Sequence, residues 1–192
     1  MYQKYFKRLF DIIFSLILIL ILIPIMVLIF FLVWIFIGFP IFTQKRPGLN
    51  NKIFTLYKFK TLYDSSKNGS ENTRQNKVGN FLRKTGLDEL PQLFNILENN
   101  MSLVGPRPLL VEYLKKYTSY EKKRHIVKPG ISGLAQVNPE LNGVKSWSKS
   151  IKLDIYYVNN ISFILDMQIL LKTLKLIFSK KKQYNDFKRF YE

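Results

Sequence analysis

A long apolar run near the start of the chain limits the possible folds more than any other feature of the sequence. Residues 12–37 contain no charged side chain, and only Ser15 and Pro24 interrupt them. Basic residues lie on both sides of the run, namely Lys4, Lys7 and Arg8 upstream and Lys45, Arg46, Lys52, Lys58 and Lys60 downstream. Lys and Arg next to an apolar membrane segment favour the cytoplasmic side, so both ends of the run favour the same side.

Pro24 offers a way for both ends to face the cytoplasm. A straight helix over residues 12–37 would reach roughly 39 Å, which exceeds the ~30 Å hydrocarbon core. Pro24 removes a backbone donor near the middle of the run and predicts a kink. We therefore expect a re-entrant helix that enters the bilayer, bends at Pro24 and leaves by the same face. The alternative is an ordinary tilted span that tolerates Pro24. A cleaved signal peptide fits less well, because its apolar region is only ~7–15 residues long.

Composition narrows the chemistry that the chain can support. Its net charge of +17 favours anionic lipids, nucleotides and phosphates, with nucleic acid as a rival partner. There is no cysteine, which excludes disulfides, thiolate nucleophiles and Cys-ligated zinc. His125 is the single histidine, which excludes a His-based metal cluster. It follows three basic residues, so we expect a basic surface here and a structural or phosphate-facing role for His125 rather than a general base. If the protein is an enzyme, carboxylates or a bound metal must carry the chemistry.

The rest of the chain predicts a mostly α-helical fold with short β segments. We expect a strand over 53–62, an exposed loop over 64–77, a helix from Leu87, another from Pro108 towards Lys123, a short strand over 131–137 and a helix containing Trp147, Ile151 and Tyr156. Residues 163–178 form an amphipathic pattern that is typical either of a core helix or of a helix in the membrane interface.

The most informative polar residues are Asp88 and Glu89, two adjacent carboxylates in a basic chain. Acidic residues at a helix start commonly cap the helix, and taken alone this is the simpler explanation. Two arginines change the context. Arg83 lies five residues upstream, and Arg107 lies between Pro106 and Pro108, where a stiff backbone suits bidentate phosphate binding.

Six segments carry a resemblance to the small monotopic phosphoglycosyltransferases, the bacterial sugar transferase family. They are KRLFD (7–11), FTQKRPGLNNKIFTLYKFKT (42–61), LDELPQLFNIL (87–97), MSLVGPRPLLVEY (101–113), KPGISGLAQVN (128–138) and LDIYYVNNISFILD (153–166). Within the family the chain is most similar to members that transfer diacetylbacillosamine phosphate. The resemblance implies a monotopic membrane protein on the cytoplasmic face of the bacterial inner membrane, with interfacial helices.

The resemblance also implies roles for individual residues. Asp88 would be the nucleophile that attacks a UDP-sugar, releases UMP and forms a covalent phosphosugar, and Glu89 would bind Mg²⁺. Undecaprenyl phosphate would then accept the sugar 1-phosphate in a ping-pong reaction. The family associates the positions of Lys58, Arg83, Arg107 and Asp166 with substrate contacts. Phospholipid would be a partner, and nucleic acid would not.

Some positions depart from the family pattern. Ile23 replaces a common serine before Pro24, Pro139-Glu140 replaces a common Gly-Arg pair, and Lys128 replaces an arginine. We expect residues 1–44 to form the membrane helix and its flanks, 45–179 the catalytic domain and 180–192 a basic tail. The alternative function is a non-enzymatic, membrane-anchored basic module that binds nucleic acid or acidic partners.

Overall fold

The structure is a computed structural model that describes residues 2–64, 74–138 and 147–178. Most of the predicted loop over 64–77, the Pro139-Glu140 pair and the predicted tail over 180–192 lie outside these residues. The described chain is mostly helical with short strands, as the sequence predicted. Its α-helices are α1 (Lys7–Phe36), α2 (Lys77–Thr85), α3 (Gln92–Leu97), α4 (Trp147–Asn159) and α5 (Phe163–Phe178). Its strands are β1 (Ile41–Pro47), β2 (Ile53–Phe59), β3 (Ser102–Val104) and β4 (Gly130–Ser132).

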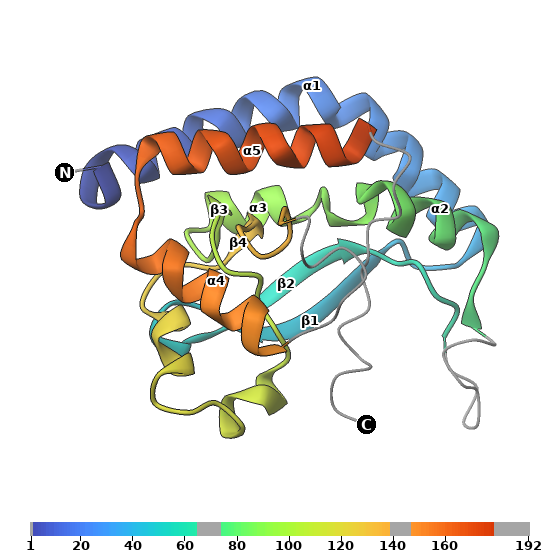
Figure 1. The fold of residues 1–192 in the computed structure, drawn as a ribbon. Coiled ribbons are helices and arrows are strands. Elements are labelled where there is room, and N and C mark those ends of the chain that lie inside the picture. Colours follow the sequence, from blue (N-terminus) through green and yellow to red (C-terminus); the bar gives the residue numbers. More distant parts are fainter. Residues whose placement is uncertain (1, 65–73, 139–146, 179–192) are drawn as a thin grey trace.

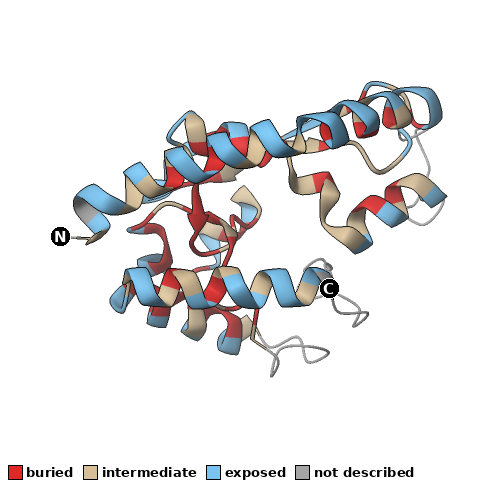
Figure 2. Cartoon of the chain, turned by 90° about the horizontal axis from the view of Figure 1, so that it is seen from above, coloured by how far each residue is buried: buried red, intermediate tan, exposed pale blue. Residues whose placement is uncertain are grey.

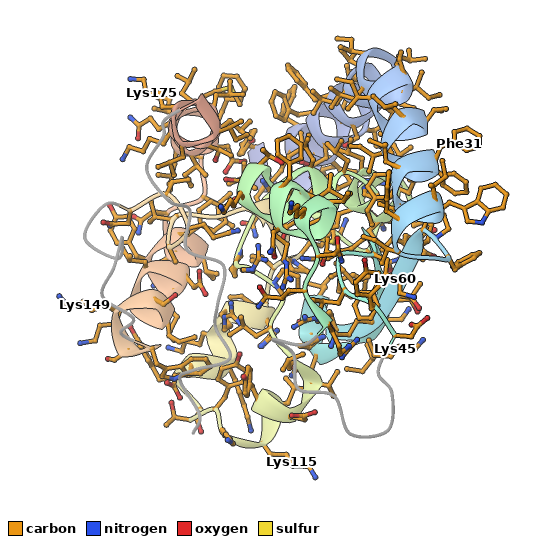
Figure 3. All side chains as sticks on the ribbon, turned by 90° about the vertical axis from the view of Figure 1, so that its right-hand side faces the viewer. Phe31, Lys45, Lys60, Lys115, Lys149 and Lys175 are labelled. Carbon is orange, nitrogen blue, oxygen red and sulfur yellow. The ribbon has the colours of Figure 1, made fainter. Side chains whose placement is uncertain are left out.

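Helix α1 arches over the rest of the protein and contains Pro24 (Figure 1). A short π-helical segment, Tyr2–Phe6, precedes it. In the described part of the chain, α1 is the one helix that is long and apolar enough to cross a membrane. Most of its large side chains are exposed, as the surface colours along it show (Figure 2). Phe31, for example, points away from the protein (Figure 3). The re-entrant course of this helix stays a prediction.

Polar contacts near the N-terminus of α1 attach this helix to α3 and β3. Arg8 donates to the carbonyl oxygens of Ile96 and Leu97 at 2.6 and 3.1 Å, at the end of α3. Asp11 is 2% exposed and accepts from the Ser102 hydroxyl and the Leu103 amide, both at 3.0 Å. Carbonyls at a helix end lack partners within the helix, so Arg8 adds donors there, although the Ile96 carbonyl also accepts from the Asn99 amide. The helix is therefore joined firmly to α3 and β3.

Strands β1 and β2 form an antiparallel hairpin in which Ile41 pairs with Phe59 and Pro47 with Ile53. The other edge of β2 is covered by a side chain from α3. Asn95 is fully buried, accepts from the Tyr57 amide at 3.0 Å and donates to the Thr55 carbonyl at 2.8 Å. Because an unpaired strand edge exposes backbone donors and acceptors, Asn95 substitutes for part of a third strand. It thereby fixes α3 against β2.

The main core lies between these elements and α5. Leu56, Ile96, Met101, Tyr157 and Ile169 are at most 2% exposed and belong to one apolar cluster. Helices α1 and α5 lie in one layer and diverge from their N-terminal ends, where Phe10 and Phe163 are in edge contact at 5.8 Å (Figure 2). Ile169 is buried, whereas Phe163, Ile164, Leu171, Leu174 and Ile177 are about half-exposed or more. Helix α5 therefore combines the two predicted patterns, with one core residue row and one exposed apolar face.

Two predicted elements in the second half of the chain need correction. The helix predicted from Pro108 towards Lys123 is instead a pair of short 3-10 helices, Val111–Lys115 and Glu121–His125. Between them Thr118 and Glu121 exchange hydrogen bonds with each other's backbone amides, which is a capping box that starts a new helix. The strand predicted over 131–137 is only Gly130–Ser132, because the following residues form a turn in which Gln136 donates to Gly133.

Helix α2 lies outside the sequence predictions and rests closely on the end of the hairpin. A β-carbon at Gly79 would meet the Thr61 carbonyl oxygen at 1.9 Å, so only glycine permits this approach. Asn76 caps the helix by accepting from the Gly79 amide at 2.6 Å. The helix ends at Gly86, whose φ of 72° is the left-handed conformation common after helices. Residues 87–89 follow directly.

Candidate active site

The predicted carboxylate pair lies in a 3-10 turn, Leu87–Glu89, between α2 and α3. The expected helix start at Leu87 is therefore displaced to Gln92, because Pro91 has no amide to donate and occupies the N-cap of α3. The Glu89 and Leu90 amides already donate to Gly86 and Leu87. These two amides are therefore paired within the turn and do not form the free N-terminus of a helix.

Two cations from other parts of the fold converge on Glu89. Lys58 comes from β2, and its Nζ atom lies 2.7 Å from Glu89 Oε1. Arg107 comes from the loop after β3 and donates to Glu89 Oε1 at 2.6 Å and to Oε2 at 3.3 Å. All three side chains are mostly buried, with 13–21% of each exposed. A carboxylate held by two charge-assisted partners is strongly ordered.

Asp88 lies beside this cluster but is less completely paired. Its Oδ2 atom is 3.9 Å from Lys58 Nζ, and its buried Oδ1 atom has no hydrogen-bond partner among the described residues. Burial raises the pKa of Asp88 to about 6, although the Lys58 charge acts in the opposite direction. At neutral pH the carboxylate is therefore ionised, with one oxygen left available.

Glu89 has the opposite tendency. Burial alone would raise its pKa, but the Arg107 and Lys58 charges outweigh burial and hold the pKa of Glu89 well below its usual range. Adjacent carboxylates whose environments separate their pKa values commonly divide chemical roles. The arrangement offers an ordered anion at Glu89 and an under-coordinated one at Asp88.

The residues fit Mg²⁺ only with help from a substrate. Mg²⁺ is usually bound through one or two carboxylates, with water and substrate phosphates as its remaining ligands. Glu89 supplies one such carboxylate, and Asp88 lies beside it with one oxygen that has no partner among the described residues. Within the described residues no group of three or more His, Cys, Asp or Glu side chains could hold a metal ion alone.

The remaining predicted site residues are placed as follows. Arg83 is in the last turn of α2, three residues before the Gly86 turn. Asp166 is fully buried in α5 and accepts from Tyr2, Lys7 and Tyr157 at 2.5–2.7 Å. Its partners thus come from the N-terminal segment and α4, and it joins these to α5. The structure brings Lys58, Asp88, Glu89 and Arg107 together.

Sequence reasoning missed a buried cluster behind this site. Arg124 is 2% exposed and pairs with Asp154, and His125 is 5% exposed rather than on the expected basic surface. Burial, followed by the Arg124 charge, lowers the pKa of His125 to about 4, so this histidine is neutral. A run of four basic residues gave no sign that two of them point inward. By contrast, Lys115, Lys149 and Lys175 lie on the surface (Figure 3).

Arg46 adds another inward cation that the sequence did not single out. It lies on β1 and donates to Gln44 at 2.6 Å, while its buried Nε atom has no hydrogen-bond partner in the described part of the chain. Burial and the nearby Arg107 charge lower its pKa to about 10, so it stays positively charged. The charges around Asp88 and Glu89 thus include three cations, which suits a polyanionic ligand.

Comparison with known proteins assigns the class. The model of the bacterial sugar transferase family matches residues 2–180, so the chain belongs to this family. It is 49% identical over 146 residues to an uncharacterized sugar transferase, EpsL, of Bacillus subtilis, with 73% of this chain and 71% of that protein covered.

Two longer relatives carry more informative names. Galactosyl transferase CpsE of Streptococcus agalactiae is 39% identical over 154 residues, covering 71% of this chain and 34% of CpsE. The UDP-N-acetylgalactosamine-undecaprenyl-phosphate N-acetylgalactosaminephosphotransferase of Aeromonas hydrophila is 37% identical over 150 residues, covering 71% and 35%. The chain thus spans about a third of the length of these two proteins. Their names do not point to the predicted diacetylbacillosamine subgroup.

Proposed function

We propose that this protein transfers a sugar 1-phosphate from a UDP-sugar to undecaprenyl phosphate and releases UMP. The observation that carries the proposal is the buried cluster in which Lys58 and Arg107 converge on the Asp88-Glu89 pair. Family membership supports the same class of reaction. The long apolar helix α1 suits an enzyme whose acceptor is a membrane lipid, and we assign the reaction to the cytoplasmic face of the bacterial inner membrane.

Asp88 is the proposed nucleophile. Its free carboxylate oxygen attacks the sugar-bearing β-phosphorus, and the bond from that phosphorus to the bridging oxygen breaks as UMP leaves. An oxygen of undecaprenyl phosphate then attacks the same phosphorus. The bond to Asp88 breaks, which regenerates the carboxylate and gives the lipid diphosphate sugar. This is a ping-pong reaction with a covalent aspartyl phosphosugar.

Lys58, Arg107 and Glu89 would balance the charge of the bound donor. Arg107 and Lys58 hold Glu89 now, and their N–H groups suit the diphosphate oxygens of a donor equally well. Arg83 stays a candidate for a substrate contact. Asp166 is fully buried and accepts from Tyr2, Lys7 and Tyr157, so we assign it to the joint between the N-terminal segment, α4 and α5 instead. Glu89 is the proposed Mg²⁺ ligand, and bound Mg²⁺ would neutralise the diphosphate and assist the leaving group.

The test is a turnover assay on the purified full chain. We expect UMP release from at least one member of a UDP-sugar panel when undecaprenyl phosphate and Mg²⁺ are present, and a phosphosugar adduct by intact mass. Asp88→Asn should abolish both, whereas Asp64→Asn, an exposed acid paired with Lys60, should not. An active Asp88→Asn enzyme would overturn the mechanism. Salt-sensitive DNA binding without UMP release would favour the basic binding module instead.

A further inference from the structure

The buried residue Arg124 connects the back of the active site to α4. Its Nε and Nη2 atoms donate to Asp154 Oδ2 at 3.0 and 2.7 Å, and Nη1 donates to the Tyr117 hydroxyl at 2.9 Å. Nη2 also donates to the backbone carbonyl of Arg107 at 2.7 Å. Arg124 lies on the 3-10 helix Glu121–His125 and Asp154 on α4, and both are at most 3% exposed.

The contact to the Arg107 carbonyl matters because the other end of Arg107 holds Glu89. The same residue therefore receives a hydrogen bond on its backbone and donates two from its guanidinium, at 2.6 and 3.3 Å. Prolines on both sides restrict its φ and ψ angles, and neighbouring Pro108 has no amide to donate. A firmly held backbone of this kind transmits its position to the side chain.

Stability alone is a poor explanation for this ion pair. Burying two charges has a desolvation cost that can exceed their attraction, and well-packed apolar residues often replace such a pair without loss of stability. The specific feature here is the spare donor directed at the Arg107 carbonyl, which an apolar pair cannot supply. The arrangement therefore favours a geometric role.

We propose that Arg124, oriented by Asp154, is a positioning residue that sets the place of the Arg107 guanidinium at the active site. This inference rests on the proposed transferase function. According to this inference, Arg124 is necessary for efficient transfer, although its side chain is too deeply buried to reach a substrate.

The first test separates geometry from stability. The double variant Arg124→Met/Asp154→Leu removes both buried charges, so we expect its melting temperature to stay within a few degrees of wild type, while kcat/KM for UMP release falls at least tenfold. Arg124→Lys is the second variant, in case the double variant does not fold. Its ammonium keeps the charge beside Asp154 but lacks the fork that also reaches Arg107, so it should keep stability and lose activity. Full activity in either folded variant would overturn the proposal.

The second test asks whether Arg124 acts through Arg107. In an Arg107→Ala background the Arg124→Lys change should cost less than twofold in kcat/KM, because the side chain that it positions is already missing. Equal losses in both backgrounds would overturn the proposed route.

A matched control variant alters another hydrogen bond between α4 and the 3-10 helix Glu121–His125, one that does not involve Arg107. Trp147 on α4 donates to Glu121 at 2.8 Å, and Trp147→Phe removes that bond while keeping an aromatic ring next to Tyr113 and Tyr117. We expect kcat/KM within twofold of wild type; a loss as large as that of Arg124→Lys would mean that general loosening explains both. The outcomes also remain separable from the proposed function, since a wild-type chain without turnover contradicts the function, whereas an active wild type with an indifferent Arg124 contradicts only the positioning role.

Discussion

At the scale of single residues, the two adjacent carboxylates show how position rather than residue type decides chemistry. Asp88 and Glu89 share one turn, yet two cations contact Glu89 closely, while Asp88 keeps an oxygen without a partner among the described residues. The sequence indicated that this pair was important. It could not indicate which carboxylate the cations would hold, because Lys58 and Arg107 come from distant segments.

The raised pKa of Asp88 predicts an acid limit to the first chemical step. Protonated Asp88 is not a nucleophile, and its pKa is about 6, so the rate of adduct formation should rise with pH through about 6 and level off above 7. Single-turnover UMP release between pH 4.5 and 8 measures this rise of the rate with pH. A flat profile down to pH 5 would contradict the assignment.

Lys58 should control the pH at which the rate of adduct formation rises. Its ammonium group favours the ionised form of Asp88 from 3.9 Å, so Lys58→Met should move the midpoint upward by about one pH unit, besides slowing the reaction. The control is Lys60→Met on the same segment, because Lys60 pairs with exposed Asp64 instead. An unchanged midpoint in Lys58→Met would show that this lysine does not tune Asp88.

At the scale of elements, the small sheet depends on a side chain from a helix. Asn95→Ala would leave the Tyr57 amide and the Thr55 carbonyl without their partner, so we expect a loss of about 2–4 kcal/mol in the free energy of unfolding. Denaturant titration in detergent measures it. Exposed Asn159→Ala should change stability by less than about 0.5 kcal/mol. Comparable effects would contradict the role of Asn95 at the strand edge.

Elements with strong local patterns could be predicted from the sequence. The strand near 53–62 and the helices at Trp147–Asn159 and Phe163–Phe178 were confirmed, because alternating or helical apolar spacing continues over their length. The predicted helix from Pro108 was wrong because the Thr118–Glu121 capping box starts a new turn. The inward course of Arg124 and His125 depends on Asp154 and Gly48, which lie far away in sequence.

At the scale of the whole molecule, the re-entrant prediction is directly testable because the chain contains no cysteine. Single cysteines at exposed Gln3 and Lys52 lie before and after α1. If both flanks face the cytoplasm, a membrane-impermeant maleimide should label neither in intact cells and both after lysis. Labelling of residue 3 alone in intact cells would establish an ordinary span and leave the transferase proposal standing.

The contacts of Arg8 and Asp11 have a mechanical consequence. They attach the first turns of α1 to the end of α3 and to β3, and α3 begins three residues after Glu89. If α1 lies in a bilayer, a shift of this helix along the membrane normal would therefore also move α3 and the Asp88-Glu89 pair, because no flexible linker separates them. The depth of α1 in the bilayer would then set the depth of Asp88 and Glu89, so acyl-chain length should influence how well the proposed catalytic carboxylates meet the phosphate of a lipid acceptor.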